Sequence, residues 1–368
     1  METGIPRLIF KRLFSKGSTH PYTGSYLGLR MWDFLGTAIL NMFAFLLVVC
    51  FLFPMSYMLV TSFKDESQFL IVGAPIWPAA VQTYSYQGSE YDVYLVPTDE
   101  GEKHWALIKP GRTESAFIDV ENPQAGPILW QGQWRRLERA FDYSPDTGNF
   151  SRIWRQNKFP RLIQNTLFIA FVSEIGVLIS SIAVAYGFSR FPLPGGKWLF
   201  ALLIGSIMIP EKVTLIPTYA LYLRLGWIGS YLPLIAPLFF GNAIFIFLLR
   251  QNFKSIPKDM DEAAMLDGAS PFRILISIIL PQSYPVVVTV ALLHFFYIWN
   301  ETRLASLYLG TKPQLQTIAF GIQNNQTVYP TPNLLQASTL LVMAVPVIVL
   351  FLSQRIFMQK VMVTGMEK

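Results

Sequence analysis

Acidic and small residues gather in one short stretch of this sequence. Residues 259–281 read DMDEAAMLDGASPFRILISIILP, with carboxylates on both sides of two alanines and a glycine close behind. Carboxylates at the start of a helix complement its dipole, and alanine leaves a flat surface that a second protein can approach closely. The pattern predicts a protein contact rather than a chemical reaction.

Turn and capping residues predict the local structure of this stretch. Asp259 can cap a helix over residues 260–267, and Gly268 can adopt the left-handed conformation that ends it. Ser270 can cap the next helix, with Pro271 at its first position. We expect a short helix joined by a tight bend to a longer one, so that a push on the first moves the second.

Residues that could support catalysis are sparse in the sequence. The three histidines lie in unrelated segments, and we find no carboxylate pair, Ser-His-Asp arrangement or metal-ligand spacing. Gly195-Gly196-Lys197 lacks the first glycine and the Ser or Thr of a phosphate-binding loop. We therefore expect a chain that is not an enzyme and that carries no metal or cofactor of its own.

The composition indicates a membrane protein with several spans. Of the 368 residues, 52% are hydrophobic and 14% are charged, against roughly 25% charged in soluble domains. The formal charge of +6 comes from Lys and Arg that cluster beside apolar segments. This placement favours contact with lipid headgroups and gives no reason to expect a nucleic-acid partner.

Six apolar stretches are long enough to be considered as transmembrane helices, which need about 20 residues. They lie near residues 34–63, 166–188, 198–219, 231–249, 283–299 and 336–357. If the chain has six spans, both termini lie on the same side of the membrane. The segments on that side contain 14 Lys and Arg residues, and the short loops on the other side contain four. The positive-inside rule then places both termini in the cytoplasm.

These boundaries divide the chain into four predicted parts. They are a cytoplasmic N-terminal tail (1–32), a first transmembrane helix (33–63), an extracytoplasmic insertion (64–161), and a transmembrane core (162–368) that includes a cytoplasmic loop (250–281). The tail has no short apolar core with a small-residue cleavage site, so we expect no cleaved leader.

The insertion is predicted to be rich in β-structure. YDVYLV (91–96) and KHWALIK (103–109) flank a turn-forming cluster, SAFIDV (115–120) follows as a third strand, and residues 133–166 look helical. Its role is open between a docking surface for a soluble partner and a purely structural decoration.

Polar side chains inside or beside the apolar stretches are candidates for a solute pathway, because an ionisable group in hydrocarbon is costly unless it faces a pore or a partner. Hydrogen bonds between helices, or an interfacial aromatic belt, would explain them equally. The candidates are Glu174, Asn242, His294, Tyr297, Trp299, Asn300 and Glu301.

The spacing of Glu262-Ala263-Ala264, Gly268, Ile278 and Leu280-Pro281 resembles the EAA loop of ABC-importer permeases. From about residue 150 onward the chain also resembles the maltose-type second permease of carbohydrate importers. The stretches that carry this likeness include NTLFIAF, AVAYGFSRFPLPGGK, FLLRQNFKSIPKDMDEAAMLDGAS and FFYIWNETRLASLYL. The insertion departs from the family, whose members usually have a shorter loop there.

The resemblance implies the six-helix type I permease fold, with the insertion between helices 1 and 2, in a bacterial or archaeal plasma membrane. It implies a homologous second permease, two copies of a cytoplasmic ATPase that binds ATP and Mg, and an extracytoplasmic solute-binding protein. The residues that match the ATPase-coupling motif are Asp261, Glu262, Ala263, Ala264, Leu266, Asp267, Gly268 and Pro281.

The expected function is therefore that of the permease subunit of an ATP-driven sugar importer. A polyol or a glycerol phosphate ester is an alternative solute. An ion-coupled secondary transporter is a rival, although Glu174 is the single clear acidic candidate deep in a predicted span. A membrane enzyme with its active site in the insertion is a second rival, but that segment has no recognisable acid–base signature.

Overall fold

The computed structural model describes residues 26–98, 100–328 and 331–366, and the chain divides into two compact units between Tyr57 and Met58. The first unit holds most of helix α2 (Tyr26–Ser62). Its stretch Phe34–Ser62 is long and apolar enough to cross a membrane, and none of its most hydrophobic window is buried. Most of the predicted N-terminal tail lies outside the described residues.

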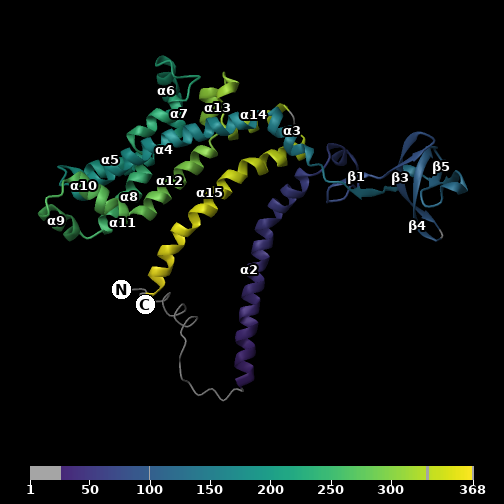
Figure 1. Cartoon of the computed structure of the whole chain (residues 1–368), viewed down its shortest axis with the longest axis horizontal. Coiled ribbons are helices and arrows are strands. Elements are labelled where there is room, and N and C mark those ends of the chain that lie inside the picture. The colour runs from purple at the N-terminus through teal and green to yellow at the C-terminus, as the bar shows by residue number, and fades with distance from the viewer. Residues whose placement is uncertain (1–25, 99, 329–330, 367–368) are drawn as a thin grey trace. The chain divides into compact units, whose positions relative to one another are not determined.

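The helical core of the second unit is built around α4 (Phe159–Arg190), which contacts α8 (Ala243–Ser255) and α12 (Tyr284–Trp299) (Figure 1). Its buried residues are aliphatic and aromatic side chains that come mostly from α4 and α8, with Val290 from α12 and the rest from residues 256–279. A Cβ atom at Gly176 would lie 2.5 Å from the Phe239 ring, so only glycine allows this close approach. The long helix α15 (Pro332–Met366) ends the described chain.

The third predicted span, 198–219, is bent rather than straight, and a second bend precedes α12, which corresponds to the fifth predicted span, 283–299. Helices α5 (Gly196–Ile207) and α6 (Glu211–Arg224) meet at 93°, at a break that contains Pro210. The segment Pro271–Gln282 meets α12 at 81°. The described residues hold four helices able to span a membrane, or up to six if each bent pair forms one span.

Shorter helices connect these elements and position the candidate sites. They are α3 (Gly148–Gln156), α7 (Leu232–Ile235), α9 (Lys258–Leu266), α10 (Pro271–Ile274), α11 (Leu280–Gln282), α13 (Arg303–Leu309) and α14 (Ile318–Val328), with the turn η4 (Ala236–Phe240) after α7.

The insertion contains the predicted β-structure. The strand order is β2-β3-β4-β5-β6, with β7 also paired to β3, and β1 pairs separately with β8. The three strands predicted from sequence are confirmed as β3, β4 and β5, and Val93 faces Ala106 across the first pair. The bounds are β1 (Ala79–Val81), β2 (Thr83–Tyr86), β3 (Ser89–Thr98), β4 (Gly101–Lys109), β5 (Glu114–Asp119), β6 (Ile128–Gln131), β7 (Glu138–Arg139) and β8 (Phe141–Tyr143).

The helix predicted over the first part of 133–166 is wrong. Residues 134–136 form a single 3-10 turn, and Glu138–Arg139 and Phe141–Tyr143 are strands. Pairing with β3 and β1 satisfies these backbone groups, and such tertiary context overrides weak local helix propensity. The helical part begins at Gly148 with α3.

Three chain segments meet at the main-chain carbonyl of Lys64. The Asn149 amide donates to this oxygen at 2.9 Å and to the Ser62 carbonyl at 3.0 Å. The Asn333 amide donates to the Lys64 carbonyl and to Asn149 Oδ1, both at 3.2 Å. Both asparagines are fully buried. The ends of α2, α3 and α15 that carry these residues are therefore fixed together.

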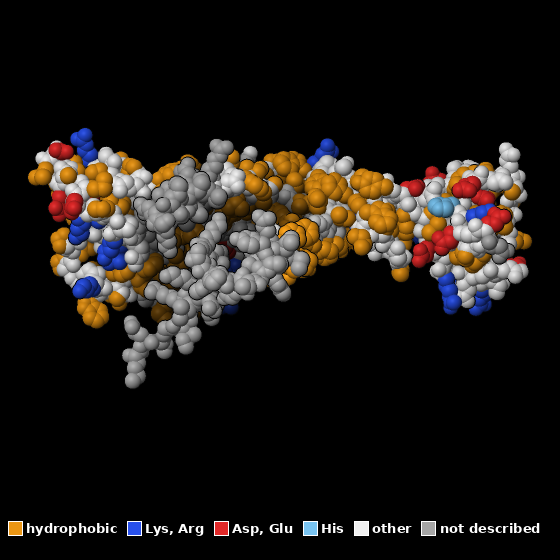
Figure 2. Space-filling view, turned by 90° about the horizontal axis from the view of Figure 1, so that it is seen from below, with side chains coloured by type: hydrophobic (Ala, Val, Ile, Leu, Met, Phe, Trp, Pro, Cys, Tyr) orange, Lys and Arg blue, Asp and Glu red, His pale blue; other side chains and the backbone are white. Residues whose placement is uncertain are grey.

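Charged side chains are unevenly distributed over the surface. On the face seen in Figure 2, hydrophobic side chains cover the helices, whereas red and blue side chains gather on the β-rich insertion and at the end that carries α9. This distribution is typical of a protein whose helices face lipid and whose loops face water.

Candidate functional site

Helix α9 forms the first half of the predicted coupling loop. It begins at Lys258 after Pro257, which occupies the N-cap position, so the predicted cap at Asp259 is wrong by two residues. Pro257 has the non-helical backbone of an N-cap residue, with ψ of 136°, and Asp259 instead lies in the first turn. Gly268 ends the helix with φ +78°, as predicted.

One face of α9 is open to a partner. Glu262, Ala263 and Asp267 are exposed, and 90% of the Leu266 surface is accessible. Ala264 is partly covered and packs against the core formed by α4, α8 and α12. This face of α9 therefore offers an apolar, a small and two acidic side chains that no described residue covers.

Asp261 lies on the opposite face of the same helix. Its Oδ2 is 2.6 Å from Nε of Arg190, the last residue of α4, and both side chains are more than nine-tenths buried. The Arg190 Nη2 also donates to the Ile256 carbonyl at 3.1 Å. This buried ion pair ties α9 to the end of α4.

A second set of contacts reinforces the same attachment. The Tyr186 hydroxyl of α4 donates to the Pro271 carbonyl at 3.0 Å, and Arg250 Nε donates to the Phe188 carbonyl at 3.4 Å. The loop is therefore held against α4 on both sides of Gly268. These contacts attach α9 and the residues after it to the end of this 32-residue helix.

The second half of the loop is less regular. Ser270 Oγ accepts from the Arg273 amide at 3.4 Å and Pro271 opens α10, as predicted. Residues Leu275–Ile279 then form a π-helix just before Pro281, which cannot donate a backbone hydrogen bond. Pro281 is exposed in α11, and the side-chain amide of the next residue, Gln282, donates to the sulfur of Met260 in α9 at 3.4 Å.

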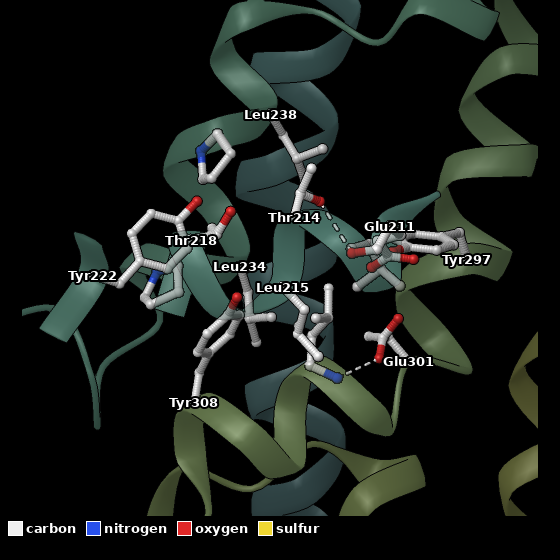
Figure 3. Close-up of a pocket in the computed structure, with 14 residues that line it drawn as sticks. Glu211, Thr214, Leu215, Thr218, Tyr222, Leu234, Leu238, Tyr297, Glu301 and Tyr308 are labelled. Atoms are coloured by element: carbon white, nitrogen blue, oxygen red, sulfur yellow. Dashed lines mark hydrogen bonds between the residues drawn. The ribbon is translucent and has the colours of Figure 1, made fainter. Parts of the chain in front are cut away.

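A pocket of about 170 Å³ lies between α6, α7, α12 and α13 (Figure 3). Leucine, isoleucine and proline side chains form part of its wall. The polar residues that line it are Glu211, Thr214, Thr218, Tyr222, Tyr297, Glu301 and Tyr308. Tyrosine rings beside carboxylate and hydroxyl groups can stack on, and hydrogen-bond to, a polyhydroxylated solute.

The two carboxylates of the pocket are held by neighbouring groups. Glu211 forms a 2.5 Å ion pair with Arg303, and this contact raises the pKa of the Arg303 guanidinium. Glu301 Oε1 accepts from the Leu304 amide at 2.7 Å, at the start of α13. Burial raises the pKa of the Tyr308 hydroxyl. The lining of the pocket contains two carboxylates and no Lys or Arg.

Two of the predicted pathway residues, Tyr297 and Glu301, line this pocket together. Trp299 is fully buried elsewhere and donates from Nε1 to the Val342 carbonyl at 3.2 Å. Asn300 is exposed, and its amide donates to the Phe296 carbonyl at 2.8 Å. Of the four predicted pathway residues between 297 and 301, the structure thus places Tyr297 and Glu301 in the pocket and leaves Trp299 and Asn300 outside it.

The other three predicted pathway residues do not line it. Asn242 caps α8 by accepting from the Ile244 and Phe245 amides. His294 Nε2 lies 2.9 Å from the Ser173 hydroxyl and joins α12 to α4. Glu174 is partly buried, and its Oε1 has no hydrogen-bond partner among the described residues.

Sequence reasoning missed the contribution of α6 and α13 to the pocket. Glu211 follows Pro210 inside the third apolar stretch, and this interruption by a charged residue was an available signal. No sequence signal identified the tyrosines, because Tyr222 and Tyr308 are 86 positions apart in the chain. They meet only after folding, with ring centroids 5.5 Å apart. Within the described residues, no three His, Cys, Asp or Glu side chains gather as a metal site.

Known proteins resemble this chain over most of its length. The family described as "Binding-protein-dependent transport system inner membrane component" matches residues 159–363. The osmoprotective compounds uptake permease protein GgtD of Synechocystis sp. is 30% identical over 267 residues, which cover 70% of this chain and 86% of that protein. The alpha-glucoside transport system permease protein AglG of Rhizobium meliloti is 30% identical, over 56% of each chain.

A solved structure supports the same fold. A chain from the crystal structure of a bacterial ABC transporter involved in the import of the acidic polysaccharide alginate superposes with a TM-score of 0.60, at 17% identity, over 91% of this chain and 99% of that one. The family match covers more than half of the present sequence. The chain therefore belongs to the inner membrane components of binding-protein-dependent transport systems, and it is a non-catalytic permease subunit of an ABC importer in the plasma membrane.

Proposed function

We propose that this subunit forms half of a translocation pathway for a sugar or a related neutral polyol, and that α9 receives the motion of a separate ATPase. The partners are a homologous permease, two copies of the ATPase with bound ATP and Mg, and a solute-binding protein. Each bent helix pair counts as one of six spans, and both termini face the cytoplasm.

The observation that carries the coupling role is the two-sided character of α9. Glu262, Ala263 and Leu266 are exposed on one side, while Asp261 is locked to Arg190 on the other. A helix with one face open to the ATPase and the other face fixed to α4 is suited to transmit a displacement of the ATPase to α4. ATP binding then shifts the equilibrium between two arrangements of the helices, because the ATPase binds them unequally.

Crosslinking in the assembled importer tests this role. With Cys50 replaced by Ala, an Ala263→Cys variant should crosslink to the ATPase, and ATP should change the yield. Lys197→Cys, an exposed position on the same predicted side, serves as the control. Equal yields at the two positions, or none at either, would exclude α9 as the coupling surface.

The pocket supports a neutral, hydroxyl-rich solute. Its lining offers three tyrosines, two threonines and two carboxylates, and Arg303 already pairs with one of these carboxylates, Glu211. This set of groups matches the hydroxyl groups of a sugar better than the phosphate of an ester. The alpha-glucoside permease AglG is consistent with a sugar. A glycerol phosphate ester stays the alternative solute, because sn-glycerol-3-phosphate transport system permease proteins UgpE are also 31–32% identical to this chain.

Uptake by the reconstituted importer distinguishes these solutes. A panel of neutral saccharides and polyols should include a transported solute, and glycerol phosphate should not compete. Thr218→Val in the pocket should raise the KM for uptake several-fold, whereas Thr37→Val in α2 should leave it unchanged. Efficient uptake of the phosphate ester would overturn the assignment of solute class.

A further inference from the structure

An exposed apolar loop follows the first membrane helix. Residues 69–77, FLIVGAPIW, carry no charge, and we refer to them as the apolar loop. The accessible fractions are 83% for Leu70, 101% for Val72, 73% for Ile76 and 55% for Trp77. Four large apolar side chains in one short loop make a patch that soluble surfaces rarely leave in water.

Hydrogen bonds hold the apolar loop against the residues directly after α2. Lys64 Nζ donates to the Pro75 carbonyl at 3.1 Å. The Gln68 side-chain amide donates to the Pro75 carbonyl at 2.9 Å and to the Trp77 carbonyl at 2.8 Å. Since α2 ends at Ser62, the base of the loop lies within a few residues of the end of a membrane span.

A second span ends at the same place. Asn333, the second residue of α15, donates to the Lys64 carbonyl, and its helix is apolar enough to cross a membrane from Pro332 to Gln354. Two helix ends and the base of the apolar loop are therefore joined at Lys64. Helix ends of this kind lie at the boundary between hydrocarbon and water, where Trp side chains are enriched.

Cationic side chains lie beside the tip of the loop. Leu70, Ile71 and Val72 line one side of a groove of about 310 Å³ that Arg135 and Arg139 also line. The Arg135 guanidinium lies 5.2 Å from the centroid of the Trp134 ring, and no carboxylate of the described residues lies within 4.0 Å of it. Arg139 is already 3.5 Å from Asp92.

We propose that the apolar loop is a lipid anchor: Leu70, Val72, Ile76 and Trp77 enter the leaflet on the side of the insertion, and Arg135 binds a phospholipid phosphate in the groove. Apolar side chains next to a cationic side chain match the two parts of a phospholipid, which are its acyl chains and its phosphate. The anchor holds the base of the insertion at the membrane surface. A soluble protein is the rival occupant, and the test below separates the two.

Site-specific fluorescence in the assembled importer tests the anchor. In a Cys50→Ala background, a polarity-sensitive dye is attached at Val72→Cys, or at Ile76→Cys as an independent second position. The importer is reconstituted into nanodiscs of phosphatidylcholine with or without bromine on the acyl chains. Leu129→Cys on β6, 71% exposed in the same insertion, is the matched control.

Brominated lipid should remove most of the emission at positions 72 and 76 and little at position 129. Arg135→Glu should weaken the quenching at position 72, while Arg136→Glu, the adjacent residue outside the groove, should leave it unchanged. Equal quenching at positions 72 and 129, or none at 72, overturns the proposal. Protection of position 72 by purified solute-binding protein, without lipid quenching, would assign the loop to that protein instead.

Discussion

Asp261 shows how the direction of one side chain changes its role. The motif spacing groups it with Glu262, Ala263 and Leu266 as a partner-contacting residue, but its carboxylate points inward to Arg190. A buried ion pair is costly to break, because the remaining charge has no water to solvate it. Asp261 is therefore placed to set the position of α9, while its exposed neighbours are placed to meet a partner.

Replacing Asp261 should uncouple the importer. Asp261→Ala leaves Arg190 buried and unpaired, which costs about 3 kcal/mol in comparable pairs. We expect α9 to detach from α4, so that ATP hydrolysis persists while solute uptake falls at least tenfold. Both rates are measured on the same proteoliposomes.

Asp259→Ala provides the matched control for this variant. Asp259 is exposed on the same helix, so its loss should change stability by no more than about 0.5 kcal/mol and leave uptake near normal. If Asp261→Ala transports as well as Asp259→Ala, the ion pair has no part in transmission.

The 3-10 turn that leads into the apolar loop should respond to acid. Hydrogen bonds from Ser67, first from its side chain and then from its amide, which is 2.8 Å from Asp65 Oδ1, hold the pKa of the Asp65 carboxyl below its usual range. Because the folded chain favours the carboxylate form of this group, the carboxylate stabilises the turn at pH values above its pKa in the unfolded chain, which is about 3.9. This stabilisation is lost as the pH falls through the lower pKa of the folded chain.

Hydrogen exchange on the assembled importer measures this loss at residues 66–70. Protection should decrease below about pH 4 in the native chain. Asp65→Asn keeps an acceptor oxygen without a titrating group, so its protection should not change over the same range. An identical acid response in the two proteins would show that another group titrates.

At the scale of elements, the sequence predicted the helix boundaries and strands that depend on a few neighbouring residues. Gly268 and Ser270 mark helix boundaries because left-handed backbone and side-chain capping depend on single residues. The strands β3 to β5 followed from aromatic and β-branched runs around turns. Residues 138–143 were missed because their strands exist only through pairing with β3 and β1, which are distant in sequence.

The pocket was only half predictable for the same reason. Tyr297 and Glu301 adjoin the end of an apolar stretch and were identified by their residue types. Glu211, Tyr222 and Tyr308 come from two other helices, and the bend at Pro210 brings one of those helices to the site. No local pattern reports the direction in which a proline-containing break turns the chain.

The glycine between α9 and α10 offers a test of backbone conformation alone. A Cβ atom at Gly268 would have nothing within 4 Å, yet φ is +78°. Gly268→Val should therefore destabilise the bend through backbone strain, by about 1–2 kcal/mol.

Thermal unfolding and solute uptake measure this effect on the loop. Gly268→Asn is the companion variant, because asparagine tolerates the left-handed region better than valine. We expect uptake to fall clearly with valine and only slightly with asparagine. Equal behaviour of the two variants would argue against strain at this bend.

At the scale of the whole molecule, the sheet-bearing part of the insertion, residues 78–144, has closely spaced ends. Val81 of β1 faces Phe141 of β8, and the Ser144 amide donates to the Pro78 carbonyl at 3.2 Å. The chain thus leaves and re-enters the base of the insertion at neighbouring points. The contacts among Lys64, Asn149 and Asn333 lie outside residues 78–144.

Removal of the sheet should leave the helical subunit intact. Residues 82–140 can be replaced by Asn-Gly, which closes β1 and β8 as a two-residue hairpin. We expect this variant to be produced in the membrane and to co-purify with the ATPase as the full chain does. Loss of both would show that the sheet is required for the helices to fold.

The pairing of β1 with β8 also has an evolutionary consequence. Two adjacent ends allow a single recombination event in the gene to add, exchange or delete the whole sheet without changing the length of any transmembrane segment. Lineages can therefore diversify the sheet that this subunit presents while inheriting its membrane machinery unchanged.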